Sequence, residues 1–138
     1  MDNFYDTAKR MHRSSETLHN NAEYHNACYL AGYVVECYAK VVVGLFSSHI
    51  PRNFRHNIVN LNNELQYLLG SNSSLSSYIV NGSTDFSQII LYWNPVNLRY
   101  IENSNSISSQ TISEAFQNEI QLAMQKLAQM QLDGHILI

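Results

Sequence analysis

The apolar positions at the start of the chain recur with the period of a helix. In residues 3–19 they fall near one face, at Phe4, Ala8, Met11 and Leu18. Asp2 or Asn3 precedes this face as a candidate N-cap. Residues 22–46 are apolar on nearly every face, which is typical of a helix surrounded by others. The Val and Tyr content is also compatible with a buried strand, but a stretch of about 25 residues without a turn signal is too long for one.

Two further helices follow from the same period. Residues 56–70 carry Leu61, Leu65 and Leu68 at helical spacing, and Gly70 is the candidate C-cap. Residues 71–109 are rich in Ser and Asn, so we expect loops with one or two short helices there. The last helix opens with a capping-box pattern at Thr111 to Glu114 and continues to a stop at Gly134.

These elements predict an all-α fold. Helices joined by short connections pack most simply as antiparallel neighbours. We therefore expect an up-and-down bundle of four to five helices, in one domain over residues 1–138, with an irregular Ser/Asn-rich segment before the last helix. A chain of 138 residues can bury a core without disulfides. Cys28 and Cys37 lie nine residues apart on one predicted helix, so they cannot bond within it and are expected as buried thiols.

Charge narrows the function classes. Eight Lys and Arg stand against eleven Asp and Glu, for a net charge of -3, which argues against a protein that coats duplex DNA. The first residues are charged rather than apolar, and Glu36 and Lys40 interrupt the longest apolar stretch. We therefore expect a cytoplasmic protein with no membrane partner. The six His lack the spacing of metal ligands, so neither a metal nor a cofactor is expected.

Glu36 and Lys40 stand four residues apart in an otherwise apolar helix, the spacing of an ion pair on one face. A charge buried alone is costly, so the two are predicted to pair. Two roles stay open. The pair is either structural, fixing helix packing or a dimer contact, or it serves a pocket in which Lys40 contacts a phosphate and Glu36 orients it.

Basic residues gather without a nearby acid in one segment, which holds His49, Arg52, Arg55 and His56. If Pro51 opens a helix, the free N–H groups of its first turn add to the positive potential, making this segment the best candidate anion site. The alternative is a solvated loop with a locally bonded His. Within this segment, His56 is the candidate general acid/base and Arg52 the donor for the developing phosphate charge.

A second candidate contact lies later in the chain, at Arg99-Tyr100. An Arg beside a Tyr can combine a phosphate contact with base stacking. The alternative is a Tyr that packs beside a surface Arg.

Residues 24–44, YHNACYLAGYVVECYAKVVVG, resemble the second-helix signature of HEPN domains, the higher eukaryote and prokaryote nucleotide-binding family of small helical bundles. Two further segments add to the resemblance: Pro51 followed by His56 and the leucine-rich helix, and Trp93 through Arg99-Tyr100. The motif order is Asn26-Ala27, Ala31-Gly32-Tyr33, Val35-Glu36-Cys37 and Lys40.

The resemblance implies a protein that binds a nucleotide or RNA, usually as a homodimer, and serves as an accessory or toxin/defence-system component in bacteria, beside a nucleotidyltransferase or another defence-system partner. Glu36, Lys40, Arg52, Arg55, Arg99 and Tyr100 are then the candidate nucleotide-binding residues. One alternative is a metal-independent endoribonuclease, whose family pattern is Arg, four to six residues, then His. Arg52 and His56 have three residues between them, and Arg13 and His19 have five. The other alternative is a non-catalytic dimeric interaction module.

Overall fold

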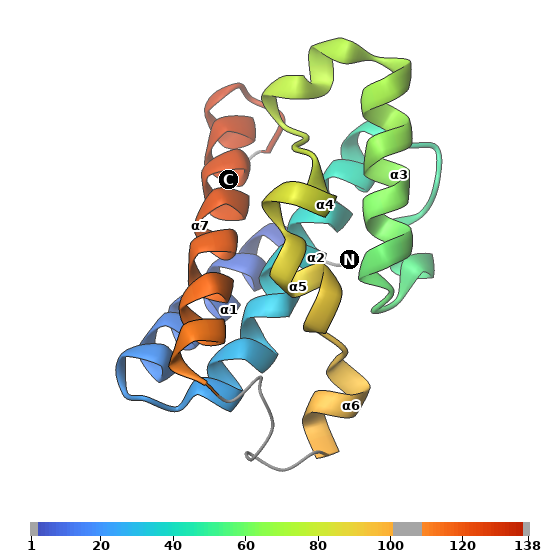
Figure 1. The fold of residues 1–138 in the computed structure, drawn as a ribbon. Coiled ribbons are helices and arrows are strands. Elements are labelled where there is room, and N and C mark those ends of the chain that lie inside the picture. Colours follow the sequence, from blue (N-terminus) through green and yellow to red (C-terminus); the bar gives the residue numbers. More distant parts are fainter. Residues whose placement is uncertain (1–2, 101–108, 137–138) are drawn as a thin grey trace.

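The computed structural model describes residues 3–100 and 109–136, and every regular element in them is helical, which confirms the all-α prediction. Four long helices carry most of the fold: α1 (Phe4–Asn20), α2 (Tyr24–Phe46), α3 (Ile58–Ser71) and α7 (Gln110–Leu132) (Figure 1). Short helical segments join them, namely η1 (Pro51–Phe54), η2 (Ser73–Ser77), α4 (Gly82–Asp85), α5 (Ser87–Tyr92) and α6 (Pro95–Tyr100).

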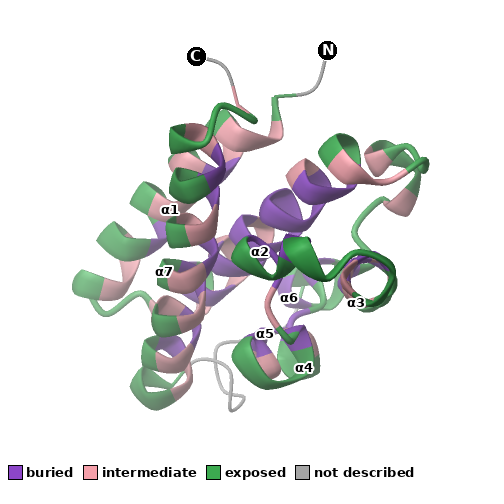
Figure 2. Ribbon diagram, turned by 90° about the horizontal axis from the view of Figure 1, so that it is seen from above, coloured by how far each residue is buried: buried purple, intermediate pink, exposed green. Residues whose placement is uncertain are grey.

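Helix α2 lies at the centre, as its apolar pattern predicts. It packs against α1, α3 and α7, and also contacts η1, α5 and α6. Figure 2 shows buried positions concentrated along α2 and on the facing sides of α1 and α7. Within the part of the chain that is described, α2 is the one helix that is long and apolar enough to cross a membrane, with a mean hydropathy of 1.4. In this fold 61% of that apolar window is buried against other helices.

Capping residues define the start of α1 and the end of α7. Asn3 caps α1, its side chain accepting from the Asp6 N–H at 2.9 Å; the alternative cap, Asp2, lies outside the described residues. Gly134 ends α7 as predicted: its φ is +85°, and its N–H donates to the carbonyl of Gln131. Its neighbour His135 donates to the carbonyl of Met130, which completes a Schellman motif.

Two predicted boundaries were wrong. Gly70 does not cap α3, which continues to Ser71 and ends at Asn72. The Asn72 side chain accepts from the Ser74 N–H at 3.1 Å, so Asn72 starts the next helical turn and thereby stops α3. At α7 the cap is Ser109, whose hydroxyl accepts from the Ile112 N–H at 3.2 Å, rather than the predicted capping box at Thr111.

The segment between α3 and α7 contains more helix than expected, since η2, α4, α5 and α6 replace the predicted one or two short helices; its residues 101–108 lie outside the described part. Distant residues hold these short helices. The Glu119 carboxylate on α7 accepts from the N–H groups of Gln88 and Ile89 at 2.9 and 2.8 Å, at the start of α5. Burial raises the pKa of Glu119 above its usual range, and these two hydrogen bonds offset part of the effect.

Trp93 anchors the end of α5 on the central helix. Its indole N–H donates to the Tyr29 carbonyl at 2.9 Å, and the ring lies over Gly32. A Cβ at position 32 would stand 2.0 Å from the indole, so only glycine permits this approach. The contact fixes α5 and α6 against α2, opposite the turn that leads into α3.

The two cysteines are free and buried, as predicted. Burial raises the pKa of Cys28 to about 12, with the Ser113 hydroxyl offsetting part of the effect. Burial likewise raises the pKa of Cys37 to about 12, and the neighbouring Glu36 adds to the shift. Both thiols are therefore protonated at neutral pH and unreactive in the folded protein.

Candidate functional site

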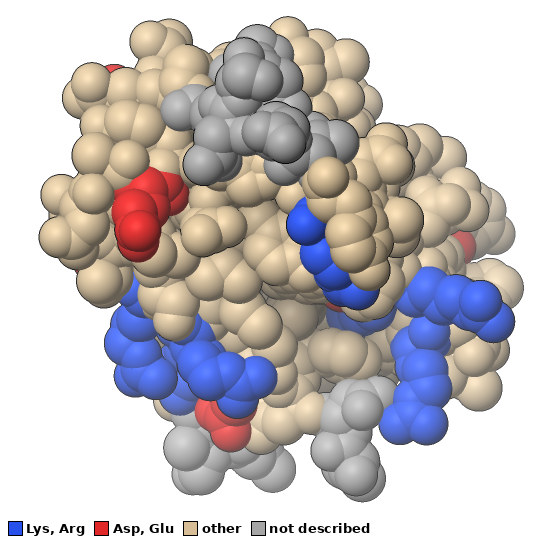
Figure 3. Space-filling model, turned by 90° about the horizontal axis from the view of Figure 1, so that it is seen from below, with Lys and Arg blue, Asp and Glu red and all other residues tan. Residues whose placement is uncertain are grey.

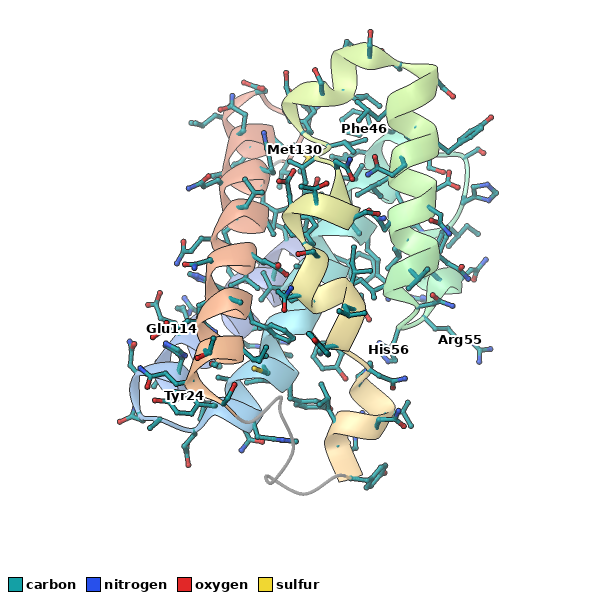
Figure 4. The ribbon with its side chains drawn as sticks, viewed as in Figure 1. Tyr24, Phe46, Arg55, His56, Glu114 and Met130 are labelled. Carbon is teal, nitrogen blue, oxygen red and sulfur yellow. The ribbon has the colours of Figure 1, made fainter. Side chains whose placement is uncertain are left out.

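A cleft of about 840 Å³ opens between the turn before α3 and the α5–α6 segment. In Figure 4, His56 lies on the side of that turn facing α5 and α6, while Arg55 points outward. Of the residues that the structure describes, three basic ones and no carboxylate line this cleft. It is formed by His49, Ile50, Asn53, Phe54, Arg55, His56, Asn57, Ile58, Val59, Asn60, Ile90, Trp93, Asn94, Pro95 and Val96.

The basic residues Arg52, Arg55 and His56 lie in a short 3₁₀ turn and the loop that follows it. Pro51 does open a helix, but only the single 3₁₀ turn of η1. Arg55 then adopts a φ of +52°, and α3 begins at Ile58 after Asn57 has capped it by accepting from the Asn60 N–H at 3.0 Å. Arg52 therefore lies in η1 and His56 in the turn that follows, so the two residues do not share a helix. Arg55 and His56 line the cleft, and Arg52 is not among the lining residues.

A non-glycine residue at positive φ is strained, typically by about 1–3 kcal/mol. Among the described residues only Ala22 and Arg55 have this backbone conformation. A glycine at position 55 would relieve the strain and lose the guanidinium.

The predicted ion pair on α2 is confirmed: Lys40 Nζ lies 3.4 Å from Glu36 Oε2, and both side chains are almost completely buried. The other carboxylate oxygen has a partner that the sequence did not indicate. His56 Nδ1 lies 2.8 Å from Glu36 Oε1, and 52% of the His56 side chain is exposed. A buried carboxylate thus fixes one ring nitrogen of a His at the edge of the cleft and leaves Nε2 on the outer side of the ring.

Aromatic rings connect the dyad of Glu36 and His56 to the opposite wall. The Tyr33 ring makes edge-to-face contacts with His56 and Trp93, with centroid separations of 5.6 and 5.0 Å. The Tyr33 and Tyr29 hydroxyls are 3.2 Å apart. Burial, with a contribution from Tyr29, raises the pKa of Tyr33 to about 12, so its hydroxyl stays neutral at physiological pH.

The remaining candidates lie outside the cleft lining. Arg99 Nε donates to the Tyr29 hydroxyl at 3.2 Å, and this bond is the main reason why the pKa of Arg99 is raised. Tyr100 is 78% exposed at the end of α6. Figure 3 shows Lys and Arg in separate groups on the face that it draws, so the basic side chains do not form one continuous patch on that face.

Sequence reasoning missed most of the uncharged lining. Four amides face the cleft, from Asn53, Asn57, Asn60 and Asn94, and the ring of Phe54 adds an apolar surface. The repeated Asn between residues 53 and 63 was the available signal, but Asn is also common in turns. Across residues 3–100 and 109–136, no group of three or more His, Cys, Asp or Glu is placed to hold a metal.

No known family model, curated protein or solved structure matches this chain.

Proposed function

We propose that the chain is a HEPN-like helical protein whose cleft binds the phosphate groups of single-stranded RNA or of a nucleotide. The observation that carries this proposal is the lining: among the described residues, His49, Arg55 and His56 line the cleft and no carboxylate does, although Glu64 and Glu36 lie 3.8 and 2.8 Å from the two His rings. Arg55 supplies the permanent positive charge that phosphate recognition needs. The start of α3 lies at the same place, and its helix dipole adds positive potential.

The size and the neutral lining fit a nucleotide unit. A volume of about 840 Å³ lies within the range of about 300–1,000 Å³ that is usual for small-ligand pockets. Asn side chains offer both donors and acceptors to base edges, and Phe54 offers a ring face for stacking. The strained Arg55 is explained if its guanidinium contacts a phosphate.

The three segments that carry the resemblance to HEPN domains meet in the fold. Residues 24–44, 51–69 and 93–100 are joined by two contacts: Glu36 with His56, and Gly32 with Trp93. Both contacts lie at the wall of the cleft. Homodimerisation and a nucleotidyltransferase or other defence-system partner remain predictions, which light scattering and co-purification with neighbouring gene products test.

The test is binding of a fluorescently labelled, unstructured RNA such as a uridine 12-mer, followed by anisotropy. Arg55→Gln is expected to weaken binding about tenfold and to lower the salt dependence by about one counterion, as for a lost phosphate contact. The matched control is Arg10→Gln, which removes the same charge from an exposed position on α1, outside the cleft. Equal losses in the two variants would reduce the interaction to non-specific charge attraction and contradict the proposal.

Arg55→Gly separates binding from folding. Glycine relieves the positive φ, so this variant is expected to be at least as stable as wild type while binding RNA as weakly as Arg55→Gln. Undiminished binding by Arg55→Gly would show that the guanidinium has no role in the cleft.

A second candidate function is metal-independent RNA cleavage, which the contact between Glu36 and His56 favours. With Nδ1–H donating to the carboxylate, Nε2 is able to accept the proton of a ribose 2′-hydroxyl. The 2′-oxygen then attacks the adjacent phosphorus, the bond to the 5′-oxygen breaks, and the leaving 5′-oxygen takes a proton from water or from the protonated His56. The products are a 2′,3′-cyclic phosphate and a 5′-hydroxyl end. Arg55, next in the chain, lines the same cleft and is the candidate for stabilising the charge on the phosphate.

Incubation of labelled RNA with the purified protein in excess chelator tests this second function. Cyclic-phosphate products that disappear in His56→Ala support it. Arg52→Ala in parallel tests Arg52, which the sequence predicts as the donor beside His56. Arg55→Gln tests Arg55, which lines the cleft. Absence of products from well-folded wild type that still binds RNA would contradict cleavage and leave binding as the function.

A further inference from the structure

A second cleft, of about 580 Å³, lies on the other side of the buried charge pair, between the start of α1 and the end of α2. As far as the described residues define it, its lining is mostly apolar and contains no carboxylate. The residues are Asn3, Phe4, Tyr5, Lys40, Val41, Gly44, Leu45, Pro51, His135 and Ile136. Within this described lining, Lys40 is the one permanent cation.

Lys40 is only loosely engaged by its partner. Its distance of 3.4 Å to Glu36 Oε2 is long for a charge-assisted hydrogen bond, which usually measures about 2.7–2.9 Å. The short bond of that carboxylate goes to His56 instead, at 2.8 Å. An ammonium group has three N–H donors. Among the described residues Glu36 is the one hydrogen-bond acceptor of Lys40, and the Phe4 ring lies 5.4 Å from Nζ.

We propose that this cleft binds a small amphipathic carboxylate, such as a medium-chain fatty-acid anion. The carboxylate head would use the donors of Lys40 that Glu36 leaves free, and the hydrocarbon chain would lie along Phe4, Val41 and Leu45. Charge complementarity selects this class, because the described lining offers one permanent cation, no carboxylate and mostly apolar contacts. Phosphate-bearing ligands such as RNA fit poorly here, since their several charges would face mainly apolar side chains.

The proposed carboxylate site and the proposed RNA cleft differ in their residues, location and ligand, so an experiment can refute one without refuting the other. The two clefts nevertheless touch opposite ends of one chain of contacts, with Lys40 at the second cleft, Glu36 in the middle and His56 at the RNA cleft. The RNA-binding assay above is therefore unaffected by failure of the carboxylate site.

Calorimetric titration with decanoate and with decanol tests the proposal on the wild-type protein, below the concentration at which either probe forms micelles. The two probes share a chain and differ in the carboxylate. Decanoate is expected to bind at least about tenfold more tightly than decanol, because it alone makes a charge-assisted bond to Lys40. Equal affinities, or no binding of decanoate, would overturn the proposal without any need for a variant.

Variants then locate the site. Lys40→Met is expected to remove the preference for decanoate, and Lys40→Arg, which keeps a cation, to retain most of it. Val41→Phe, which fills the cleft and leaves Lys40 in place, is expected to weaken both probes. A preference for decanoate that persists in folded Lys40→Met, or binding unchanged in Val41→Phe, would place the bound probe elsewhere and refute the assignment.

Discussion

Replacement of Glu36 by Gln tests how the charges in the core are balanced. The change keeps the side-chain volume and removes the one negative charge that both Lys40 and His56 contact. The two partners then face different situations. Water can solvate His56, whose side chain is 52% exposed, whereas Lys40 is 6% exposed and keeps a charge without a counter-ion.

The expected loss of stability follows from that difference. Removing one partner of a buried ion pair costs about 3–5 kcal/mol, because the remaining charge stays desolvated. The exposed His56 contact adds less than about 1 kcal/mol. Since the total stability of a domain is about 5–15 kcal/mol, Glu36→Gln is expected to lose a large fraction of it.

The double variant Glu36→Gln/Lys40→Met removes the orphaned charge. Methionine fills the volume of the lysine stem, and the glutamine carbonyl still accepts from His56 Nδ1. We expect the double variant to be at least about 2 kcal/mol more stable than Glu36→Gln alone, since a neutral pair of similar shape is often tolerated.

Urea unfolding, followed by circular dichroism, measures these free energies for wild type, both single variants and the double variant. The reasoning is refuted if Glu36→Gln lies within about 0.5 kcal/mol of wild type, which is the usual range for surface substitutions. It is equally refuted if the double variant is no more stable than Glu36→Gln.

Three further predictions concern other parts of the fold. Gly32→Ala is expected to destabilise by about 1–3 kcal/mol, because its Cβ would meet the Trp93 ring; unchanged stability and tryptophan fluorescence would contradict this contact. Burial raises the pKa of Glu119 above 4.5, so this carboxyl group binds its proton more tightly in the folded state than in the unfolded state. The protonated Glu119 therefore contributes to stability below pH 4.5, and this contribution is lost as the pH rises through the folded-state pKa. Glu119→Gln should therefore flatten the measured dependence of stability on pH above 4.5, and an unchanged slope would exclude this carboxyl as its source. Cys28 and Cys37 should react with Ellman's reagent at pH 8 only after unfolding, since a pKa of about 12 leaves a thiolate fraction of about 10⁻⁴; rapid reaction of the native protein would argue against their burial.

The long helices could be predicted from the sequence because their apolar periodicity is a local property. The capping residues were harder to predict, because several residues near one helix end can act as the cap. Ser109 rather than Thr111 caps α7, and Asn72 rather than Gly70 ends α3. In both cases the choice depends on which side chain reaches a free N–H, and a pattern of residue types does not contain that information.

The short helices between α3 and α7 depend on residues far away in the chain. The start of α5 is held by Glu119, about 30 residues later, and its end is held through Trp93 by Tyr29 and Gly32 on α2. Helices of six residues are too short to form without such contacts. Local patterns therefore predicted too few of them.

In the candidate site, too, contacts within one helix could be predicted and contacts between elements could not. The pair of Glu36 and Lys40 could be predicted because both residues lie on one helix, four positions apart. The contact of Glu36 with His56 spans 20 residues and two elements, so no spacing rule indicates it. The positive φ of Arg55 also rotates the turn, which brings Arg55 to the cleft lining and leaves Arg52 outside it.

The most direct measurement for the proposed binding of RNA in the cleft is an NMR titration of the ¹⁵N-labelled protein with an unlabelled uridine octamer. Trp93 is the only tryptophan, so its indole N–H gives one unambiguous signal at the cleft wall. The account predicts saturable shifts of this signal and of the backbone amides of residues 53–60, with small changes on α7. Shifts confined to other surfaces, or no shifts at RNA concentrations that saturate the anisotropy assay, would contradict it.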